Sequence, residues 1–233
     1  MTRLSLKDFE NFWTYYKGEP HQKKAIEIMY GQMHSGLLDD EHSWVTTYRN
    51  SAKVTSTAAV LDCPYQSQND NISGTGYREC FSSSCAMVSM FYGKIENDDA
   101  YNAIRQQYGD STDAQAQLRA LRSLGLEANF ITNATVDDLK AQILANRPTP
   151  CGWLHHGTAH APSGSGHWSV VCGFDDVKQV WVHNDPNGVC NLETGKYTSE
   201  LNGQLIEYSY ANWDPRWLPD GNGWMMDIRL PKP

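Results

Sequence analysis

The chain has 233 residues, of which 40% are hydrophobic and 11% aromatic, enough to build one large domain or one domain with a small appendage. It carries 19 basic and 27 acidic residues, for a net charge of −8. This balance, without any basic tract, argues against nucleic acid and anionic membranes as partners. The N-terminus lacks the apolar core of a signal peptide and no run approaches membrane-spanning length, so we expect a protein that is cytoplasmic as synthesised.

The first fifty residues show helical periodicity. Aromatic side chains recur at i, i+3, i+4 and i+7 over residues 5–17, and a second apolar pattern covers residues 21–34. These patterns predict a helical unit over residues 1–52, followed by a main domain over residues 53–233. We expect this unit to pack on the main domain, with a separate ligand-binding role as the alternative.

A cysteine stands at the start of the segment most typical of a buried helix. Cys80 is followed by a run to Phe91 with apolar residues on most sides of the predicted helix. The hydroxyls of Ser82–Ser84 are N-cap candidates. Because the positive end of a helix favours negative charge on a sulfur, the pattern predicts a nucleophilic Cys80. Cys85, which would face the core, is the weaker alternative.

The segments around this helix carry structural signals but little chemistry. Thr135 and Asp138 form a capping-box pattern at the start of a helix. Gln68 lies in a polar loop, where its amide could donate to an oxyanion. The predicted elements are strands over 54–64 and 127–132 and helices over 98–109, 112–125 and 135–145.

From Cys151 onward the periodicity changes from helix to strand. A strand at 151–154 and a polar, flexible stretch at 155–166 precede two strands over 167–174 and 180–184. These two strands read as an antiparallel hairpin, which places His167 and Asp185 at the same end of the pair. A last strand covers 225–230. Aromatic residues are expected in the loops before it: Tyr197, Tyr208, Tyr210, Trp213 and Trp217.

Together, four residues match the needs of a cysteine hydrolase. A thiolate at Cys80 would attack, and His167 would keep it ionised and then protonate the leaving group. Asp185 would fix the tautomer of the imidazole, and Gln68 would help to bind the oxyanion.

The sequence also resembles a known family, the papain-fold cysteine peptidases of the bacteriocin-processing (double-glycine leader) type, in the form found in phage and bacterial cell-wall hydrolases. The resemblance is carried by residues 64–71, 80–88, 166–174 and 183–188. It implies an α+β, papain-like fold in which a central helix packs on an antiparallel sheet. It also implies the same four roles, with Cys80 as nucleophile, His167 as base, Asp185 as orienting carboxylate and Gln68 as oxyanion amide.

The sequence departs from the family pattern in three places. Phe81 follows the nucleophile, where the family usually has glycine. The gap from Gln68 to Cys80 is longer than in many relatives, which leaves Gln66 as an alternative amide. Glu79 precedes the nucleophile, so its negative charge has to be offset by Arg78 or by solvent.

Further residues are candidates for substrate or metal binding. Trp153, His155, His156 and Trp168 are expected to line the substrate cleft, with ordinary packing as the alternative. Zinc is disfavoured because the histidines at 155, 156, 160, 167 and 183 form no i, i+4 pair on a predicted helix, since His156 and His160 are four apart only within a polar, flexible stretch, and two adjacent histidines point apart in an extended segment. We therefore expect no metal and no cofactor. The six scattered cysteines are expected to be reduced thiols.

The favoured function is a cysteine peptidase or amidase that cuts amide bonds in the stem peptides of peptidoglycan, as a phage endolysin does. Such an enzyme would be a monomer and would reach the cell wall through a phage lysis system. The net charge of −8 counts mildly against tight adhesion to an anionic wall. The alternatives are a processing protease acting on a protein leader or virion component, and a catalytically silent wall-binding module.

Overall fold

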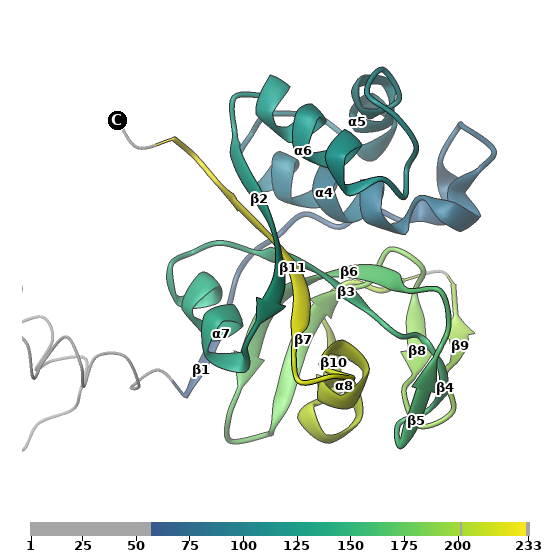
Figure 1. Cartoon of the computed structure of the whole chain (residues 1–233), viewed down its shortest axis with the longest axis vertical. Helices are drawn as coiled ribbons and strands as arrows, with labels where there is room; N and C mark the ends of the chain where they lie inside the picture. Colours follow the sequence, from purple (N-terminus) through teal and green to yellow (C-terminus); the bar gives the residue numbers. More distant parts are fainter. Residues whose placement is uncertain (1–56, 201, 232–233) are drawn as a thin grey trace, which may run out of the picture. The chain divides into compact units, whose positions relative to one another are not determined.

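The computed structural model describes residues 57–200 and 202–231, so the helical unit predicted over residues 1–52 lies outside the described residues. Within these residues, three helices stand on one side of an antiparallel sheet and two more on the other (Figure 1). No helix in this part of the chain has the length and apolar character needed to cross a bilayer. The helices are α4 (Cys80–Phe91), α5 (Asp98–Arg105), α6 (Ala114–Ser123), α7 (Val136–Leu144) and α8 (Tyr210–Trp217).

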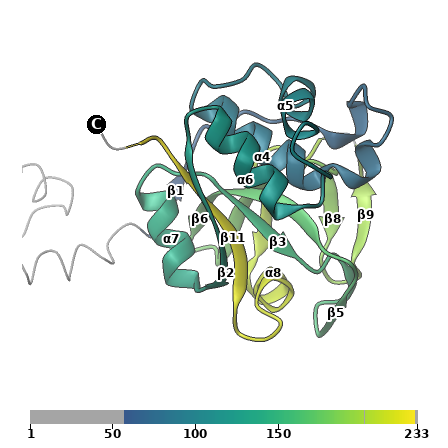
Figure 2. The same ribbon diagram turned by 45° about the horizontal axis from the view of Figure 1, so that its top comes forward.

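The main sheet has the strand order β10-β7-β6-β3-β11-β2, and β1 also pairs with β6. All of these pairs are antiparallel. Two small hairpins, β4–β5 and β8–β9, lie outside the main sheet (Figure 2). The strands of the main sheet are β1 (Ala58–Val60), β2 (Glu127–Ala134), β3 (Thr149–Trp153), β6 (His167–Asp175), β7 (Val180–Asn184), β10 (Ile206–Ser209) and β11 (Gly223–Arg229), and those of the hairpins are β4 (His156–Thr158), β5 (Ala161–Ser163), β8 (Val189–Asn191) and β9 (Lys196–Ser199).

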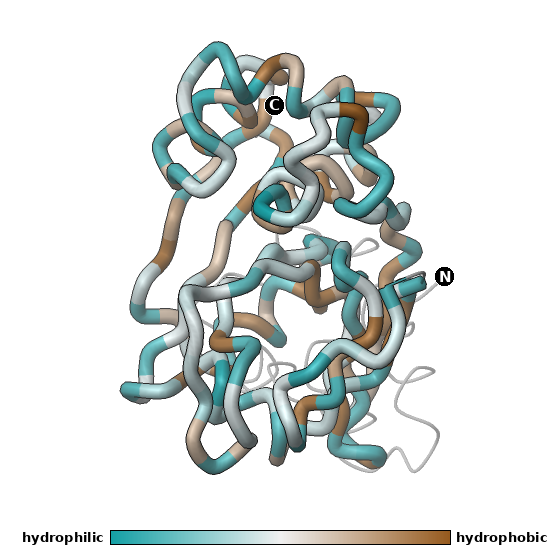
Figure 3. The backbone as a smooth tube through the Cα atoms, turned by 90° about the vertical axis from the view of Figure 1, so that its right-hand side faces the viewer, coloured by the Kyte–Doolittle hydropathy of each residue, from teal (hydrophilic) through white to brown (hydrophobic). Residues whose placement is uncertain are grey.

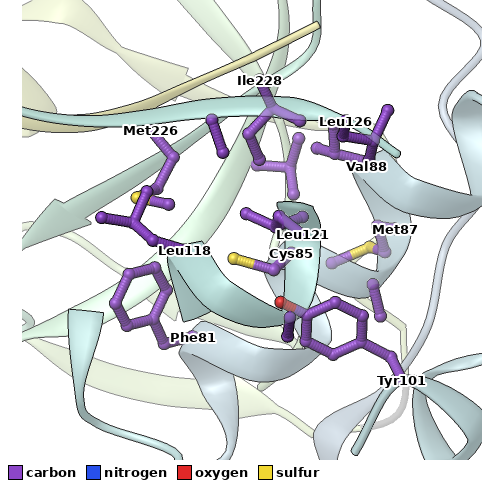
Figure 4. Close-up of a cluster of buried hydrophobic side chains, with 14 of the residues drawn as sticks. Phe81, Cys85, Met87, Val88, Tyr101, Leu118, Leu121, Leu126, Met226 and Ile228 are labelled. Atoms are coloured by element: carbon purple, nitrogen blue, oxygen red, sulfur yellow. The ribbon is translucent and has the colours of Figure 1, made fainter. Parts of the chain in front are cut away.

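The sheet separates two hydrophobic cores, because successive residues of a strand point to opposite faces. On β11, Met226 and Ile228 join the core beneath α4, α5 and α6, whereas Met225 joins the core with α7 and α8. On β6, Val170 and Val171 divide in the same way. Figure 4 shows the first core, in which Phe81, Cys85 and Leu121 are among the packed residues. Figure 3 shows that hydrophobic residues lie along inner segments of the backbone, whereas hydrophilic residues lie at many of the outer turns.

Several predicted elements are confirmed. The helices expected over 98–109 and 112–125 are α5 and α6, each one turn or so shorter than predicted. The capping box is also present: Thr135 Oγ1 accepts from Asp138 N at 3.2 Å, and Thr135 N donates to Asp138 Oδ2 at 3.0 Å. Strands at 151–154, 167–174, 180–184 and 225–230 are found with small shifts at their ends.

Other predictions about local structure are wrong. The central helix begins at Cys80, and Ser82–Ser84 are buried inside it, where Ser83 Oγ donates to Asp98 Oδ2 at 2.6 Å. The stretch 155–166 contains the β4–β5 hairpin in place of a flexible loop. Of the strand predicted over 54–64, residues 54–56 lie outside the described residues, and the remainder contains only the short strand β1. The C-terminal aromatic residues lie in β9, β10 and α8 and not in loops.

Hydrogen bonds from a buried arginine explain why the segment that contains β4 and β5 forms a defined hairpin. Arg216, in α8, is fully buried and directs its guanidinium at backbone carbonyls. It donates to Leu154 at 2.9 Å, to His156 at 3.0 Å and to Gly157 at 2.8 Å, and also to Leu192. These five hydrogen bonds use every donor of the side chain. Contacts of this kind come from a distant helix and leave no local signal in the sequence.

Candidate active site

Cys80 is the first residue of α4 and is the one cysteine that solvent reaches. It is partly exposed, whereas the other five cysteines are buried, and all six are free thiols. Cys85 has no exposed surface, and burial raises the pKa of its thiol. A buried thiol that resists ionisation is a poor nucleophile, so the structure favours Cys80 over Cys85.

His167 and Asp185 form a buried pair at one end of the β6–β7 hairpin. His167 Nε2 lies 2.7 Å from Asp185 Oδ1, and the two residues are 4% and 0% exposed. This contact leaves Nδ1 as the ring nitrogen available to Cys80, which lies near enough to the imidazole to raise its pKa. Burial acts to lower the pKa of His167, but the negative charges of Asp185 and Cys80 outweigh it and raise the pKa.

Two tyrosines also hold the Asp185 carboxylate, chiefly through Oδ2, the oxygen that does not contact His167. Tyr208 Oη donates to Asp185 Oδ2 at 3.0 Å, and Tyr197 Oη donates to the same oxygen at 3.1 Å. The backbone N–H of Asn187 donates to Asp185 Oδ1 at 3.0 Å. Tyr197 and Tyr208 are expected from the sequence only as loop aromatics, and their contact with Asp185 is not predicted, because they come from β9 and β10 and have no fixed spacing from Asp185.

Gln68 lies in a short 3-10 helix, Gln68–Asp70, and is 3% exposed. Its backbone N–H donates to the carbonyl of Pro186 at 2.9 Å, which ties it to the residue after Asp185. Its side-chain Nε2 donates to Gly76 O at 2.9 Å, so one amide hydrogen is left for another acceptor. The alternative amide, Gln66, is directed at α5, where its Oε1 accepts from Asp98 N at 3.4 Å.

Glu79, which is 2% exposed, holds the loop between Gln68 and Cys80 in place through hydrogen bonds to its carboxylate. Its carboxylate accepts from Asn71 at 2.6 Å, Ser73 at 2.9 Å and Thr75 at 2.8 Å. Asn102 adds a contact at 3.2 Å, and Arg105 supplies the opposite charge at 3.9 Å. The expectation that Arg78 or solvent offsets this charge is wrong, because Arg78 pairs with Asp110 and Glu79 is sealed from water.

Phe81, in the position where the family usually has glycine, packs against the residue after His167. Its ring stacks on the indole of Trp168 with centroids 3.7 Å apart and planes 5° from parallel. Phe81 is 2% exposed and belongs to the core beneath α4. The large side chain is therefore part of the contact between the helix and the sheet.

The four residues predicted to line the substrate cleft fall into two groups. Trp153 and Trp168 lie in the wall of a pocket beside His167, although Trp153 is itself buried. His155 and His156 do not line that pocket. Their rings lie 3.8 Å apart, so the expectation that they point apart is wrong. Burial and the nearby charge of His167 lower the pKa of His155 to about 4.

The described residues offer no group of three or more histidine, cysteine, aspartate or glutamate side chains arranged to hold a metal ion. Within these ranges, the His155 ring contacts the rings of His156 and His167 without forming such a cluster.

A helix on an antiparallel sheet, with a cysteine at the helix start and a histidine on the sheet, defines the papain-like cysteine peptidase fold. The sequence profile of the Peptidase_C39 like family matches residues 60–213, and the chain belongs to this family. Membership supports peptidase activity, which is a hydrolase reaction. No curated protein matches the chain.

Solved structures with similar folds include a C39-like peptidase from Bacillus anthracis, which is 13% identical, with a TM-score of 0.51 over 75% of this chain and 98% of that chain. A double-glycine motif protease from an AMS/PCAT transporter, in complex with a leader peptide, is 18% identical, with a TM-score of 0.47 over 74% and 95%. The peptidase domain of Streptococcus ComA, a bifunctional ABC transporter, is 15% identical, with a TM-score of 0.44 over 66% and 93%.

Proposed function

We propose that the protein is a cysteine peptidase in which Cys80 is the nucleophile, His167 the acid–base residue and Asp185 the orienting carboxylate. The observation that carries this proposal is the buried 2.7 Å contact between His167 and Asp185, together with a partly exposed Cys80 near enough to the imidazole to raise its pKa. A raised pKa at His167 favours an imidazolium beside a thiolate.

In the first half of the reaction, the Cys80 sulfur attacks the carbonyl carbon of the scissile amide. The imidazolium of His167 then donates its proton to the departing amine, and the C–N bond breaks to leave a thioester on Cys80. In the second half, neutral His167 takes a proton from water, whose oxygen attacks the thioester. The carboxylic acid leaves and the thiolate is restored.

The oxyanion of each tetrahedral intermediate needs hydrogen-bond donors. The backbone N–H of Cys80 is free of an intrahelical partner, because the first N–H groups of a helix have none. The remaining amide hydrogen of Gln68 is the second donor. Its backbone contact with Pro186 and its side-chain contact with Gly76 hold it in place, so it needs little reorganisation during the reaction.

Two substrate classes are candidates. The sequence predicts a peptidoglycan stem peptide, as for an endolysin, cut by a peptidase or amidase. Membership in the Peptidase_C39 like family is equally consistent with a protein leader or another polypeptide segment. In either case the reacting group is an amide, and the same three residues act on it.

The test compares the full-length protein with its Cys80→Ala variant on two substrates. One is purified peptidoglycan, and the other is a mixture of polypeptides. We expect fragments that depend on Cys80, and mass analysis of the fragments identifies the bond. Equal cleavage by Cys80→Ala, or no cleavage of either substrate, would contradict the proposal. Muropeptide release would support the endolysin-like substrate, and cut polypeptides would support processing.

A further inference from the structure

A partly buried tyrosine connects three segments of the chain near Asp185. Tyr65 lies in the loop that leads to Gln68, the candidate oxyanion donor. Its phenol oxygen donates to the carbonyl of Asp185 at 3.2 Å and accepts from the backbone N–H of Gly203 at 3.0 Å. Asp185 and Gly203 are themselves joined, since Asp185 N donates to Gly203 O at 2.9 Å. The hydroxyl of Tyr65 therefore closes a ring of hydrogen bonds between the three segments.

The side chain of Asn184 joins the same three segments. Asn184 is the last residue of β7 and has no exposed surface. Its Nδ2 donates to Cys63 O at 2.9 Å and to Pro64 O at 3.3 Å. Its Oδ1 accepts from the backbone N–H of Leu205 at 2.9 Å. Two side chains thus hold these segments together, one from the loop and one from the strand.

The chain after Tyr65 continues along the turn that follows Asp185. Gln68 N donates to Pro186 O at 2.9 Å, and Ser67 Oγ donates to the same oxygen at 3.4 Å. The backbone of Gln68 is therefore placed by the turn that also carries the orienting carboxylate. Because an oxyanion donor stabilises a transition state only when it is aimed at the developing charge, a small displacement of this loop would slow the reaction.

A phenol is suited to this position because its oxygen can donate and accept at the same time. Burial raises the pKa of Tyr65, so the hydroxyl keeps its proton at neutral pH. In Tyr65→Phe the N–H of the buried Gly203 would lose its partner, whereas the Asp185 carbonyl would keep the N–H of Gly188 at 3.1 Å. The substitution opens the ring of hydrogen bonds by the removal of one oxygen atom.

We propose that Tyr65 is a positioning residue that acts through Gln68, by holding the oxyanion donor in place against the turn that carries Asp185. The inference rests on the proposed peptidase function and extends it to a residue one step away from the reacting atoms. If Tyr65 acts in this way, loss of its hydroxyl slows those reactions of Cys80 that form an oxyanion and spares those that do not.

Two small reagents distinguish this role from a general loss of structure. The Cys80 sulfur attacks the carbonyl carbon of 4-nitrophenyl acetate, and the carbonyl oxygen becomes an oxyanion. The C–O bond then breaks, nitrophenolate leaves with the electron pair, and an acetyl thioester remains. With iodoacetamide, the same sulfur displaces iodide from a CH₂ carbon and no oxyanion forms. The ratio of the two rates therefore reports the oxyanion donors, whereas a change in the amount of thiolate affects both reactions.

This ratio is compared in the full-length protein, Tyr65→Phe, Gln68→Ala and the double variant, with Cys80→Ala as the background. Gln68→Ala should lower the ratio about tenfold or more, because it removes an oxyanion donor. Tyr65→Phe should lower it about threefold or more alone, and less than about twofold when combined with Gln68→Ala, because residues that act through one group are not additive. Iodoacetamide labelling of the five buried cysteines reports any unfolded protein.

Tyr92→Phe is the matched control. Tyr92 Oη donates to Ile228 O at 3.0 Å, so this variant also loses a bond from a phenol to a backbone carbonyl. Tyr92 follows the last residue of α4, at the opposite end of the helix from Cys80. We expect this variant to keep the wild-type ratio even where its urea midpoint is lower.

The outcomes separate the two proposals. Nitrophenolate release that does not depend on Cys80 would overturn the peptidase and the inference together. If release depends on Cys80 but Gln68→Ala keeps the wild-type ratio, the nucleophile stands and the role of Tyr65 is wrong. An equal ratio in Tyr65→Phe and Tyr92→Phe, or an equal loss from Tyr65→Phe with and without Gln68→Ala, would overturn the role of Tyr65 alone.

Discussion

Phe81 and Trp168 stack face to face, and each directly follows a residue of the candidate catalytic pair. Their ring centroids are 3.7 Å apart, with Phe81 on α4 after Cys80 and Trp168 on β6 after His167. Since the nucleophile and the base come from different halves of the domain, the distance between them depends on how the helix meets the sheet. The stacked rings fix this contact one residue away from the reacting atoms.

Replacing Phe81 by alanine should therefore lower both stability and activity. Truncation of a buried phenylalanine costs about 3–5 kcal/mol, and the cavity would lie at the contact between helix and sheet. Urea unfolding measures the loss of stability, and kcat/KM at low temperature, where the variant is folded, measures the loss of activity. Tyr77→Ala is the matched control, because Tyr77 is 79% exposed in the same half of the domain. A folded Phe81→Ala protein with wild-type kcat/KM would show that the stack does not position the pair.

Tyr208→Phe should weaken the hold on Asp185. The substitution removes a 3.0 Å hydrogen bond to a fully buried carboxylate, removes the acceptor of the Cys190 backbone N–H at 3.0 Å, and leaves the ring in place. Losing a hydrogen bond to a buried charged group costs about 1.5–3 kcal/mol. We expect a lower urea midpoint, a lower kcat and a shifted pH profile of kcat.

The control for Tyr208→Phe is Tyr210→Phe, in which the lost bond is a 2.7 Å contact with Asp176. Asp176 pairs with Lys140 at the surface and makes no contact with His167. This variant should keep the wild-type pH profile. If the two variants share the same profile, Tyr208 has only a structural role.

Much of the fold could be predicted from the sequence because it depends on patterns of residues that are close together in the chain. The capping box at Thr135 and the strand character of the segments that form β6 and β11 each depend on residues a few positions apart. The hairpin reasoning that placed His167 beside Asp185 is also local, since it needs only two strands and a turn. The catalytic roles of these residues remain predictions.

The parts that sequence reasoning missed depend on contacts between distant segments. The start of α4 was misplaced because Ser82–Ser84 have the composition of a cap, and only tertiary packing shows that they are buried. The offset of Glu79 by Arg105 connects α4 with α5, and the two tyrosines connect β9 and β10 with the carboxylate of Asp185. No spacing in the sequence predicts such contacts between distant segments.

Gly76→Ala should disturb the candidate oxyanion donor. A Cβ atom at Gly76 would overlap the backbone oxygen of Gln68, and that backbone cannot move freely because it is bonded to Pro186. We expect a lower kcat from a displaced Gln68, together with a lower melting temperature. Gly74→Ala in the same loop meets no atom within 4 Å and should cost only about 1 kcal/mol, from its positive φ of 69°. Equal kcat values in the two variants would contradict this account of Gln68.

Because His183 is buried, we predict that the folded protein loses stability in acid. Burial lowers its pKa to about 3 from an ordinary value near 6.5. The folded protein therefore binds fewer protons than the unfolded chain between these pH values, so stability present above pH 6.5 is lost as the pH falls towards 3. The slope is up to about 1.4 kcal/mol per pH unit.

The urea midpoint of wild type and of His183→Gln, measured at several values from pH 7.5 to pH 4.5, isolates this contribution. Comparison of the two proteins is necessary because burial raises the pKa of Asp98 to about 6, which acts in the opposite sense. The difference between the two midpoints should shrink as the pH falls below 6.5. A difference that stays constant across this range would mean that His183 is not the group responsible.

The measurement that tests the central claim most directly is the alkylation of the six cysteines by iodoacetamide near neutral pH, read by peptide mass spectrometry. The account predicts that Cys80 alone is labelled, because the other five thiols are buried. It also predicts that His167→Gln slows this labelling by about tenfold or more, since a thiolate loses its imidazolium partner, while His155→Gln leaves the rate near that of wild type. Labelling spread over several cysteines, or a Cys80 that reacts equally fast without His167, would contradict the pairing of this sulfur with this imidazole.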